Sequence, residues 1–237
     1  MQIGILQTGH APAEIAREKG DYPRMFARLL ADGGFTFRTW DVEAGELPAD
    51  AHEADGWLIT GSRHGVYEDH PWIAPLEGFI REAVAAHVPL VGICFGHQIV
   101  ARALGGTVEK HAGGWAVGPQ DYEIRDPESG TDLSLRLNAW HQDQVTTPPP
   151  GAEVIGRSAF CPIAALNVGG RVLTFQPHPE FDADTIRALA AHRGRGVVPD
   201  DRLDAALAAL EGPNDADKAA DIIIRFFRRH AEGRRAR

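Results

Sequence analysis

The sequence predicts an α/β fold, in which a mostly parallel sheet carries helices on both faces. Short strand-like runs alternate with segments of helical periodicity throughout the first half of the chain. Pro89–Ile93 is the most hydrophobic of these runs, as expected for a strand covered on both sides. The chain has 237 residues, and its 43% hydrophobic content can fill the core of one large domain. We expect residues 1–237 to form a single domain, with a core over about 1–182 and C-terminal helices over about 184–230.

The first half of the chain contains the strands and helices that define the predicted parallel sheet. The helical segments carry apolar side chains at intervals of three and four residues, which gives each helix one apolar face. Gly33-Gly34 can end the first helix, because glycine tolerates the left-handed conformation. In chain order we expect strand Gln2–Gln7, helix Tyr22–Ala31, strand Phe35–Val42, strand Gly56–Thr60, helix Pro75–His87, strand Pro89–Ile93 and helix Phe95–Leu104.

The second half has a different pattern, which predicts antiparallel strands followed by helices. Its apolar runs are short and are separated by turns rather than by helical segments. Gly169-Gly170 stands between two such runs and is typical of a hairpin turn. The expected strands are Val117–Ile124, Leu133–Leu137, Glu153–Ile155, Ile163–Val168 and Val172–Gln176, and the expected helices are a segment from Asp184 onward, Arg202–Leu210 and Asn214–His230.

Charge and composition argue against several classes of function. Asp and Glu number 33 against 24 Lys and Arg, a net charge of −9, which argues against binding to nucleic acid or to an anionic membrane. Arg225, Arg228 and Arg229 in the last helix are interpreted as a solvated face. No apolar run is long enough to span a membrane, and Met1 leads into a strand without a secretory signal. With 2 cysteines and no disulfide scaffold, we expect a cytoplasmic protein.

The segment Gly92-Ile93-Cys94-Phe95-Gly96 carries the strongest chemical signal. An apolar strand runs into Gly-x-Cys-x-Gly and then directly into a helix, which is the nucleophile-elbow pattern with cysteine in place of serine. The flanking glycines remove Cβ atoms that would clash in such a strained turn. The following helix N-terminus favours a thiolate, and the Phe95 N–H can stabilise an oxyanion. Cys161 lacks this context and is interpreted as a small buried hydrophobe.

A cysteine nucleophile needs a base, and the base needs a partner that holds its tautomer. Of the 11 histidines, His178 has the best context, because it follows the apolar strand Val172–Gln176. Catalytic residues of open α/β sheets collect at the carboxyl ends of strands. Glu180 lies two residues further on, on the same side of an extended segment. We therefore predict His178 as the base and Glu180 as the group that orients it.

These motifs resemble the class I glutamine amidotransferase family, whose catalytic triad is Cys-His-Glu. The resemblance extends from about Asp55 to Phe181 and implies a flavodoxin-like open, twisted sheet with a small additional antiparallel sheet. The segments that carry it are Gly92–Gln98, His178-Pro179-Glu180, Leu58–Gly65, Gly114–Gly118 and Trp140–Val145. It implies a triad of Cys94, His178 and Glu180, oxyanion donors at the backbone N–H groups of Ser62 and Phe95, and substrate contacts from Gly61, Gln98 and the backbone around His141.

The resemblance also implies an activity: cleavage of the γ-amide of glutamine or of a γ-glutamyl compound through a thioester on Cys94. No phosphate-binding loop of a synthetase is present, and the Thr60–His64 and Gly114-Trp115 segments look most like a stand-alone branch that includes γ-glutamyl peptidases. One alternative is a glutaminase subunit that delivers ammonia to a separate synthetase partner. Another is a cysteine-type α/β-hydrolase acting on esters, although those enzymes place the acid before the histidine. A binding module without catalysis is the third.

Neither a cofactor nor a metal ion is expected from the sequence. The histidines show no ligand constellation in their spacing, and His64 and His70 are interpreted as surface residues. The expected partner is a small-molecule substrate, with no nucleic acid and no membrane.

Overall fold

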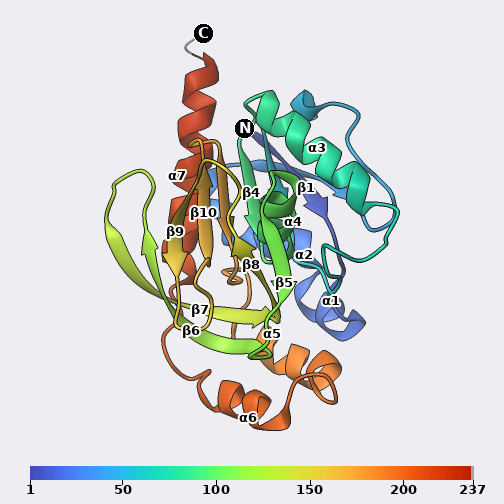
Figure 1. Ribbon diagram of the computed structural model, residues 1–237, viewed down its shortest axis with the longest axis vertical. Coiled ribbons are helices and arrows are strands. Elements are labelled where there is room, and N and C mark those ends of the chain that lie inside the picture. Colours follow the sequence, from blue (N-terminus) through green and yellow to red (C-terminus); the bar gives the residue numbers. More distant parts are fainter. Residues whose placement is uncertain (236–237) are drawn as a thin grey trace.

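The computed structural model describes residues 1–235 and is built around a nine-stranded sheet (Figure 1). The strand order is β2-β1-β3-β4-β11-β10-β9-β6-β7, and β5 pairs with β8 in a separate small sheet. The strands from β2 to β11 in that order are parallel, and the remainder continue the sheet by antiparallel pairing. The strands are β1 Gln2–Gln7, β2 Thr36–Asp41, β3 Gly56–Ile59, β4 Leu90–Ile93, β5 Thr107–Lys110, β6 Ala116–Arg125, β7 Asp132–His141, β8 Asp143–Thr147, β9 Ala152–Arg157, β10 Ala165–Val168 and β11 Val172–Phe175.

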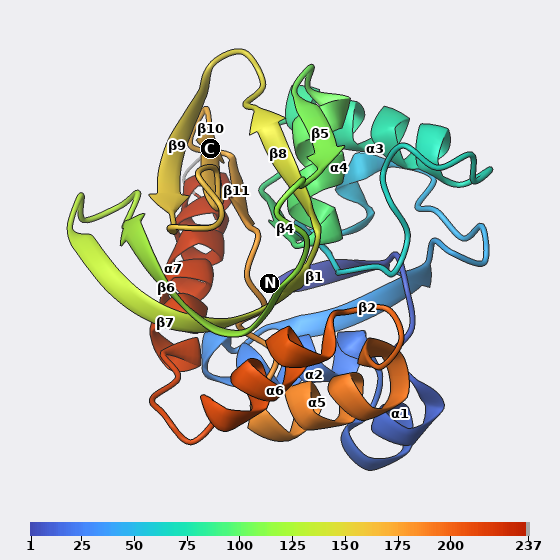
Figure 2. The ribbon, with the colours of Figure 1, turned by 60° about the horizontal axis from the view of Figure 1, so that its bottom comes forward.

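Helices cover both faces of the parallel half (Figures 1 and 2). On one face, Phe26 of α2 and Ile223 of α7 share a core with Ile5 of β1. On the other face, Phe79 of α3 and Ile99 of α4 share a core with strands β3 and β4. Because β3, β4 and β11 are covered on both sides, every residue in them is buried, as their apolar sequences require. The helices are α1 Ala13–Lys19, α2 Tyr22–Leu29, α3 Ile73–Ala85, α4 Phe95–Ala103, α5 Ala183–Leu189, α6 Asp200–Ala208 and α7 Ala216–Arg235.

The expected parallel strands, the helices between them and the hairpin at Gly169-Gly170 are confirmed. Three elements were missed: α1, β5 and β8. In α1 only Ile15 is buried, so the helix has no apolar stripe to reveal it. Strand β5 has no fully buried residue, and β8 begins directly after β7 with only Gln142 between them. Their sequences therefore carry little of the periodicity on which the predictions depend.

Arg225, Arg228 and Arg229 are exposed, as expected of a solvated face, but each of them also bonds to a loop outside the helix. Arg225 Nη2 lies 2.5 Å from Asp126 Oδ2, in the loop after β6. Arg229 Nη2 donates to the Gly170 carbonyl at 2.9 Å, and Arg228 donates to backbone carbonyls of the loop before β2. These arginines fasten α7 to three loops. The loops are distant in sequence, so the pattern within the helix does not show these contacts.

The segment after β11 packs against the helices near the N-terminus. Helices α5 and α6 lie beside α1 and α2 (Figure 2), and Ile186 and Leu189 of α5 share a hydrophobic cluster with Ile15 and Met25. This arrangement gives one wall of the cavity described below. Among residues 1–235, no helix combines the length and the apolar character that crossing a membrane requires.

Candidate active site

Cys94 lies at the sharp turn between β4 and α4. Its backbone has φ 53° and ψ −102°, a region that residues with a side chain rarely occupy. A Cβ at Gly92 would lie 2.5 Å from the Gly96 carbonyl oxygen, and one at Gly96 would lie 2.4 Å from the Ile59 carbonyl oxygen. Positions 92 and 96 must therefore be glycine. The Cys94 N–H donates to the Phe175 carbonyl at 2.8 Å, which holds the turn against β11. The strained elbow that the sequence predicts is confirmed.

His178 follows β11 and is held on three sides. The ring nitrogen Nδ1 lies 2.7 Å from Glu180 Oε1. The backbone N–H of His178 donates to the Asn138 carbonyl of β7 at 2.8 Å. The Phe181 ring stacks on the imidazole, with centroids 4.0 Å apart and planes inclined by 4°. The Asn138 side chain in turn donates to the Phe181 carbonyl at 2.8 Å. These contacts hold the backbone and the ring of His178 in place in the absence of substrate.

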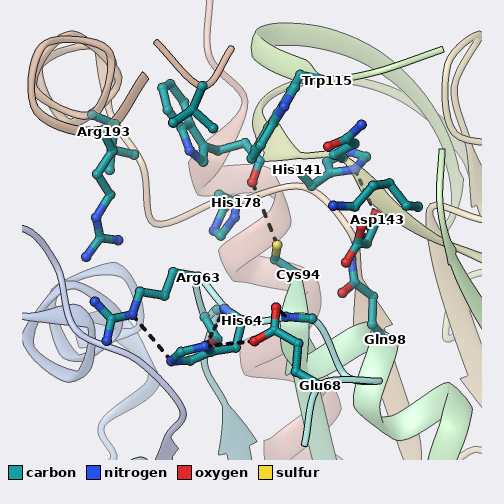
Figure 3. A pocket seen from close by; sticks show the side chains of 18 of the residues that line it. Arg63, His64, Glu68, Cys94, Gln98, Trp115, His141, Asp143, His178 and Arg193 are labelled. Carbon is teal, nitrogen blue, oxygen red and sulfur yellow. Dashed lines mark hydrogen bonds and ion pairs between the residues drawn. The ribbon is translucent and has the colours of Figure 1, made fainter. Parts of the chain in front are cut away.

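Cys94 and His178 meet beside Gly61. A Cβ built on Gly61 would lie 2.9 Å from His178 Cε1 and 3.8 Å from Cys94 Cβ. Figure 3 shows the sulfur and the imidazole in the same cavity, with the sulfur 4.0 Å from the Trp140 carbonyl oxygen. Burial opposes a charge on His178, but the Glu180 carboxylate and the Cys94 sulfur outweigh it and raise the pKa of His178. The structure thus brings the predicted nucleophile, base and orienting group together.

The Gly61–Ser62 peptide has a defined orientation beside Cys94. The Thr60 hydroxyl donates to the Gly61 carbonyl at 3.1 Å, and the Thr8 hydroxyl, which donates to the Thr60 carbonyl at 2.9 Å, lies 3.3 Å from the Gly61 carbonyl oxygen. Both threonines are fully buried. In a trans peptide the N–H points away from the carbonyl, so these bonds turn the Ser62 N–H to the side opposite the threonines. The Phe95 N–H is the first of α4 and has no intrahelical acceptor.

The resemblance assigns Gln98 and His141 to substrate binding. Both line the cavity, but their side-chain nitrogens form hydrogen bonds within the protein. Gln98 Nε2 donates to the Asp143 carbonyl at 2.9 Å and to Gln176 Oε1 at 3.1 Å. His141 Nδ1 lies 3.1 Å from the same carbonyl, so this nitrogen carries the proton. Burial, with the nearby charge of His178, lowers the pKa of His141 to about 3, which keeps the ring neutral. Both side chains therefore position the turn between β7 and β8.

The cavity has a volume of about 370 Å³ and two different sides (Figure 3). Gln98, His141 and Asp143 lie on one side of Cys94, and Arg63 and Arg193 lie on the other. Arg193 was not predicted as a site residue, since it belongs to a π-helical turn, Ala190–Gly194, that follows α5. Asn138 was also missed, because its contact with His178 depends on the position of β7 beside the His178 segment. The Phe181 ring, three residues after His178, was missed as well.

The folded chain brings together one group of possible ligands that the spacing of the histidines did not indicate. His64, Glu68 and His70 offer one ligand atom each, and these atoms all lie within 4.8 Å of one another. They belong to the loop after β3, and His64 and Glu68 line the cavity. The folded loop brings these groups together although their spacing matches no common metal motif.

Comparisons with known proteins agree with the fold. Residues 24–189 match the family model of class I glutamine amidotransferase. A glutamine amidotransferase-like protein of Schizosaccharomyces pombe is 30% identical over 244 residues, which cover 95% of this chain and 98% of the relative. Gamma-glutamyl peptidase 4 of Arabidopsis thaliana is 29% identical over 218 residues, covering 84% and 83%. A glutamine amidotransferase from Methylobacillus flagellatus superposes with a TM-score of 0.75 at 23% identity, covering 97% and 94%.

The chain belongs to the class I glutamine amidotransferase family. The expected fold, a mostly parallel α/β sheet with additional antiparallel strands, is confirmed.

Proposed function

We propose that the protein hydrolyses the γ-amide of γ-glutamyl compounds through a thioester on Cys94. The observation that carries this proposal is the convergence of Cys94, in a strained elbow, with the His178 imidazole that Glu180 orients. A nucleophile, a base and a group that holds the base are the three elements that this chemistry needs. The similarity to γ-glutamyl peptidases supports the choice of bond.

In the first half of the proposed reaction, the Cys94 thiolate attacks the γ-carbonyl carbon of the substrate. The N–H groups of Phe95 and Ser62 donate hydrogen bonds to the carbonyl oxygen and stabilise the negative charge that develops on it. The protonated His178 transfers a proton from Nε2 to the leaving nitrogen, the carbon–nitrogen bond breaks, and an amine departs. The γ-glutamyl group remains on the sulfur as a thioester. The raised pKa of His178 supports its role as the acid, because the ring is then protonated when the amine leaves.

In the second half, the neutral His178 removes a proton from water, and the hydroxide attacks the thioester carbon. The carbon–sulfur bond breaks, glutamate is released, and the Cys94 thiolate and the imidazolium are restored. Glu180 stays ionised throughout and stabilises the imidazolium. Positioned acid–base catalysis of this kind contributes roughly 10²–10⁴-fold to the rate.

The two sides of the cavity support an orientation for the substrate. The γ-glutamyl group, with its α-amino and α-carboxylate ends, lies against Gln98 and the turn at Asp143. The leaving group then extends toward Arg193, which donates to Tyr22 Oη at 3.3 Å and to the His10 carbonyl. Burial raises the pKa of Tyr22 to about 12, so neither partner neutralises the guanidinium. A negatively charged leaving group, such as an amino acid with a free carboxylate, complements this side.

The test measures glutamate release from glutamine and from a panel of γ-glutamyl dipeptides by purified wild-type, Cys94→Ser and Cys161→Ser proteins. Cys161 is a matched control, since it is also buried but does not line the cavity. We expect Cys94→Ser to lose turnover and Cys161→Ser to keep it. A glutamine-like diazoketone should label Cys94 and spare Cys161. Full turnover by Cys94→Ser would overturn the proposal.

The alternatives predict other results in the same assay. A glutaminase subunit of a synthetase would be inactive alone and would release glutamate only after addition of its partner from cell extract. An ester hydrolase would cleave esters and leave the γ-glutamyl panel intact. Either result would replace the proposed stand-alone hydrolysis.

A further inference from the structure

Two histidines and one glutamate converge on the loop that follows β3, next to the candidate active site. His64 Nδ1 lies 3.1 Å from Glu68 Oε2, and His70 Nε2 lies 2.7 Å from the same oxygen. Zinc binds imidazole nitrogen and carboxylate oxygen at about 2.0–2.2 Å, so its ligand atoms lie roughly 3–4 Å apart. The three ligand atoms here are already within 4.8 Å of one another. Small side-chain rotations would bring all three to one ion.

The contacts of His64 leave one position that suits a cation. Its Nε2 lies 3.1 Å from Glu43 Oε1 while its Nδ1 faces Glu68. A neutral imidazole has one N–H and donates to only one of two carboxylates. In one tautomer Nε2 donates to Glu43, and the Nδ1 lone pair and the Glu68 carboxylate are then two acceptors that face each other. In the other tautomer Nε2 accepts from Arg63 Nε at 3.3 Å and Nδ1 donates to Glu68. In the first tautomer a proton or a metal ion between the two acceptors removes that conflict, and a metal ion also takes the His70 nitrogen.

Glu43 has the features of an outer-sphere partner. It is mostly buried, with its side chain 18% exposed, and it also accepts from Arg63 Nη2 at 3.1 Å. In metal sites a carboxylate commonly accepts from the second nitrogen of a ligand histidine, which holds the tautomer and raises ligand basicity. Arg63 Nε lies 3.3 Å from His64 Nε2, so its charge offsets part of the carboxylate charge around the cluster.

We propose that His64, Glu68 and His70 bind one divalent transition-metal ion of the zinc type, with Glu43 as the outer-sphere carboxylate. Two imidazoles and one carboxylate are ligands that suit zinc better than magnesium or calcium. The His70 ring is supported by Trp72, whose ring lies parallel to it at 5.8 Å between centroids. The site is separate from Cys94, His178 and Glu180, and the inference does not depend on the proposed hydrolysis.

A metal ion bound at this site would stabilise the loop that carries Ser62. The His64 N–H donates to Ser62 Oγ at 3.2 Å, and the Gly65 N–H donates to Glu68 Oε1 at 2.9 Å. A metal ion that joins His64 to Glu68 and His70 therefore stabilises the loop at both ends. An ion that binds only the folded protein raises the melting temperature as its concentration increases.

The test is a calorimetric titration of zinc chloride into chelator-treated protein. The Cys94→Ser protein is used as the parent, so that the thiol cannot act as a ligand. We expect one zinc per chain and a melting temperature that rises with zinc. In this parent, Glu68→Gln and His70→Ala should each weaken binding by more than about 100-fold, and Glu43→Gln by about 10–100-fold. The matched control is His52→Ala, an exposed histidine outside the cluster.

Two results would overturn the inference. One is the absence of zinc binding to the parent; the other is binding that Glu68→Gln and His70→Ala leave intact, which would mean an adventitious ion only. Glu68→Gln keeps the size and shape of an exposed side chain, so this variant decides the question even if His70→Ala folds poorly. Cobalt in place of zinc adds a spectroscopic check on nitrogen and oxygen ligation. Glutamate release by the wild type is measured separately, so failure of the metal site and failure of the proposed hydrolysis are distinguished.

Discussion

His178 Nδ1 lies 2.7 Å from Glu180 Oε1, and these two side chains are 4% and 1% exposed. A carboxylate buried this completely beside an imidazole has a strong effect on its charge, because little water screens the interaction. Burial alone would lower the pKa of His178, but Glu180, with the Cys94 sulfur, raises it instead. The Glu180 carboxylate and the Cys94 sulfur therefore both favour the protonated form of His178.

Replacing Glu180 by glutamine should move the pH dependence of hydrolysis. The protonated His178 is the proposed proton donor to the leaving amine, so activity falls as pH rises through its pKa. Glu180→Gln removes the largest cause that raises this pKa, and the alkaline limb of kcat/KM should shift to lower pH. We also expect kcat to fall by roughly 10²–10⁴-fold. An alkaline limb that stays in place would show that Glu180 does not control the charge of His178.

Adding one methyl group at Gly61 should disturb the site without unfolding the chain. The alanine Cβ would lie 2.9 Å from His178 Cε1, so the imidazole must move away from Cys94. We expect kcat to decrease by at least tenfold, since small displacements of reacting groups are costly. Gly78→Ala in α3 is the control, because its Cβ would have open space. That variant should keep full turnover and gain about 0.5–1 kcal/mol in free energy of unfolding.

The part of the site that could be predicted from sequence lies in short motifs. Strand β4, the two glycines and Cys94 are contiguous, and the local geometry follows from their order. His178 and Glu180 are two residues apart at the end of a buried strand, so their contact is also local. These positions needed only the periodicity of the strands and the steric demands of the turn.

The remainder depends on contacts between distant segments. Asn138 reaches His178 because β7 lies beside the segment after β11, an arrangement that no short pattern contains. Arg193 enters the cavity because α5 and the turn after it fold back to the N-terminal helices. The exposed strand β5 and the weakly apolar helix α1 gave no periodic signal. Long-range register and loop conformation were therefore the limits of the prediction.

The threonines behind the Gly61 carbonyl allow a test of the proposed oxyanion donor. Thr8→Val keeps the shape of the side chain but removes the hydroxyl that donates to the Thr60 carbonyl at 2.9 Å and lies 3.3 Å from the Gly61 carbonyl oxygen. The Gly61–Ser62 peptide then loses part of its support, and we expect kcat to fall several-fold with little change in KM. Loss of one oxyanion donor outright costs about 3 kcal/mol, which sets the upper bound. Thr8→Ser retains the hydroxyl and should restore kcat; equal losses in both variants would point to packing instead.

Arg193 should decide which leaving groups the cavity prefers. Its side chain lies on the side of the cavity opposite Gln98. Its described hydrogen-bond partners, Tyr22 and the His10 carbonyl, are uncharged. Arg193→Gln removes the charge, and a charge-assisted hydrogen bond contributes about 1.5–3 kcal/mol. We therefore expect kcat/KM to fall about 10–100-fold for γ-glutamyl dipeptides with a free carboxylate and to change little for glutamine.

The control for this prediction is Arg195→Gln, two residues away. Arg195 pairs with Asp200 and Asp204 at 2.7 Å each and does not line the cavity. Its replacement should leave both substrates unaffected. The measurement is kcat/KM for a dipeptide, for the same dipeptide with its carboxylate amidated, and for glutamine. If Arg193→Gln weakens all three equally, the arginine supports the cavity wall and does not recognise the carboxylate.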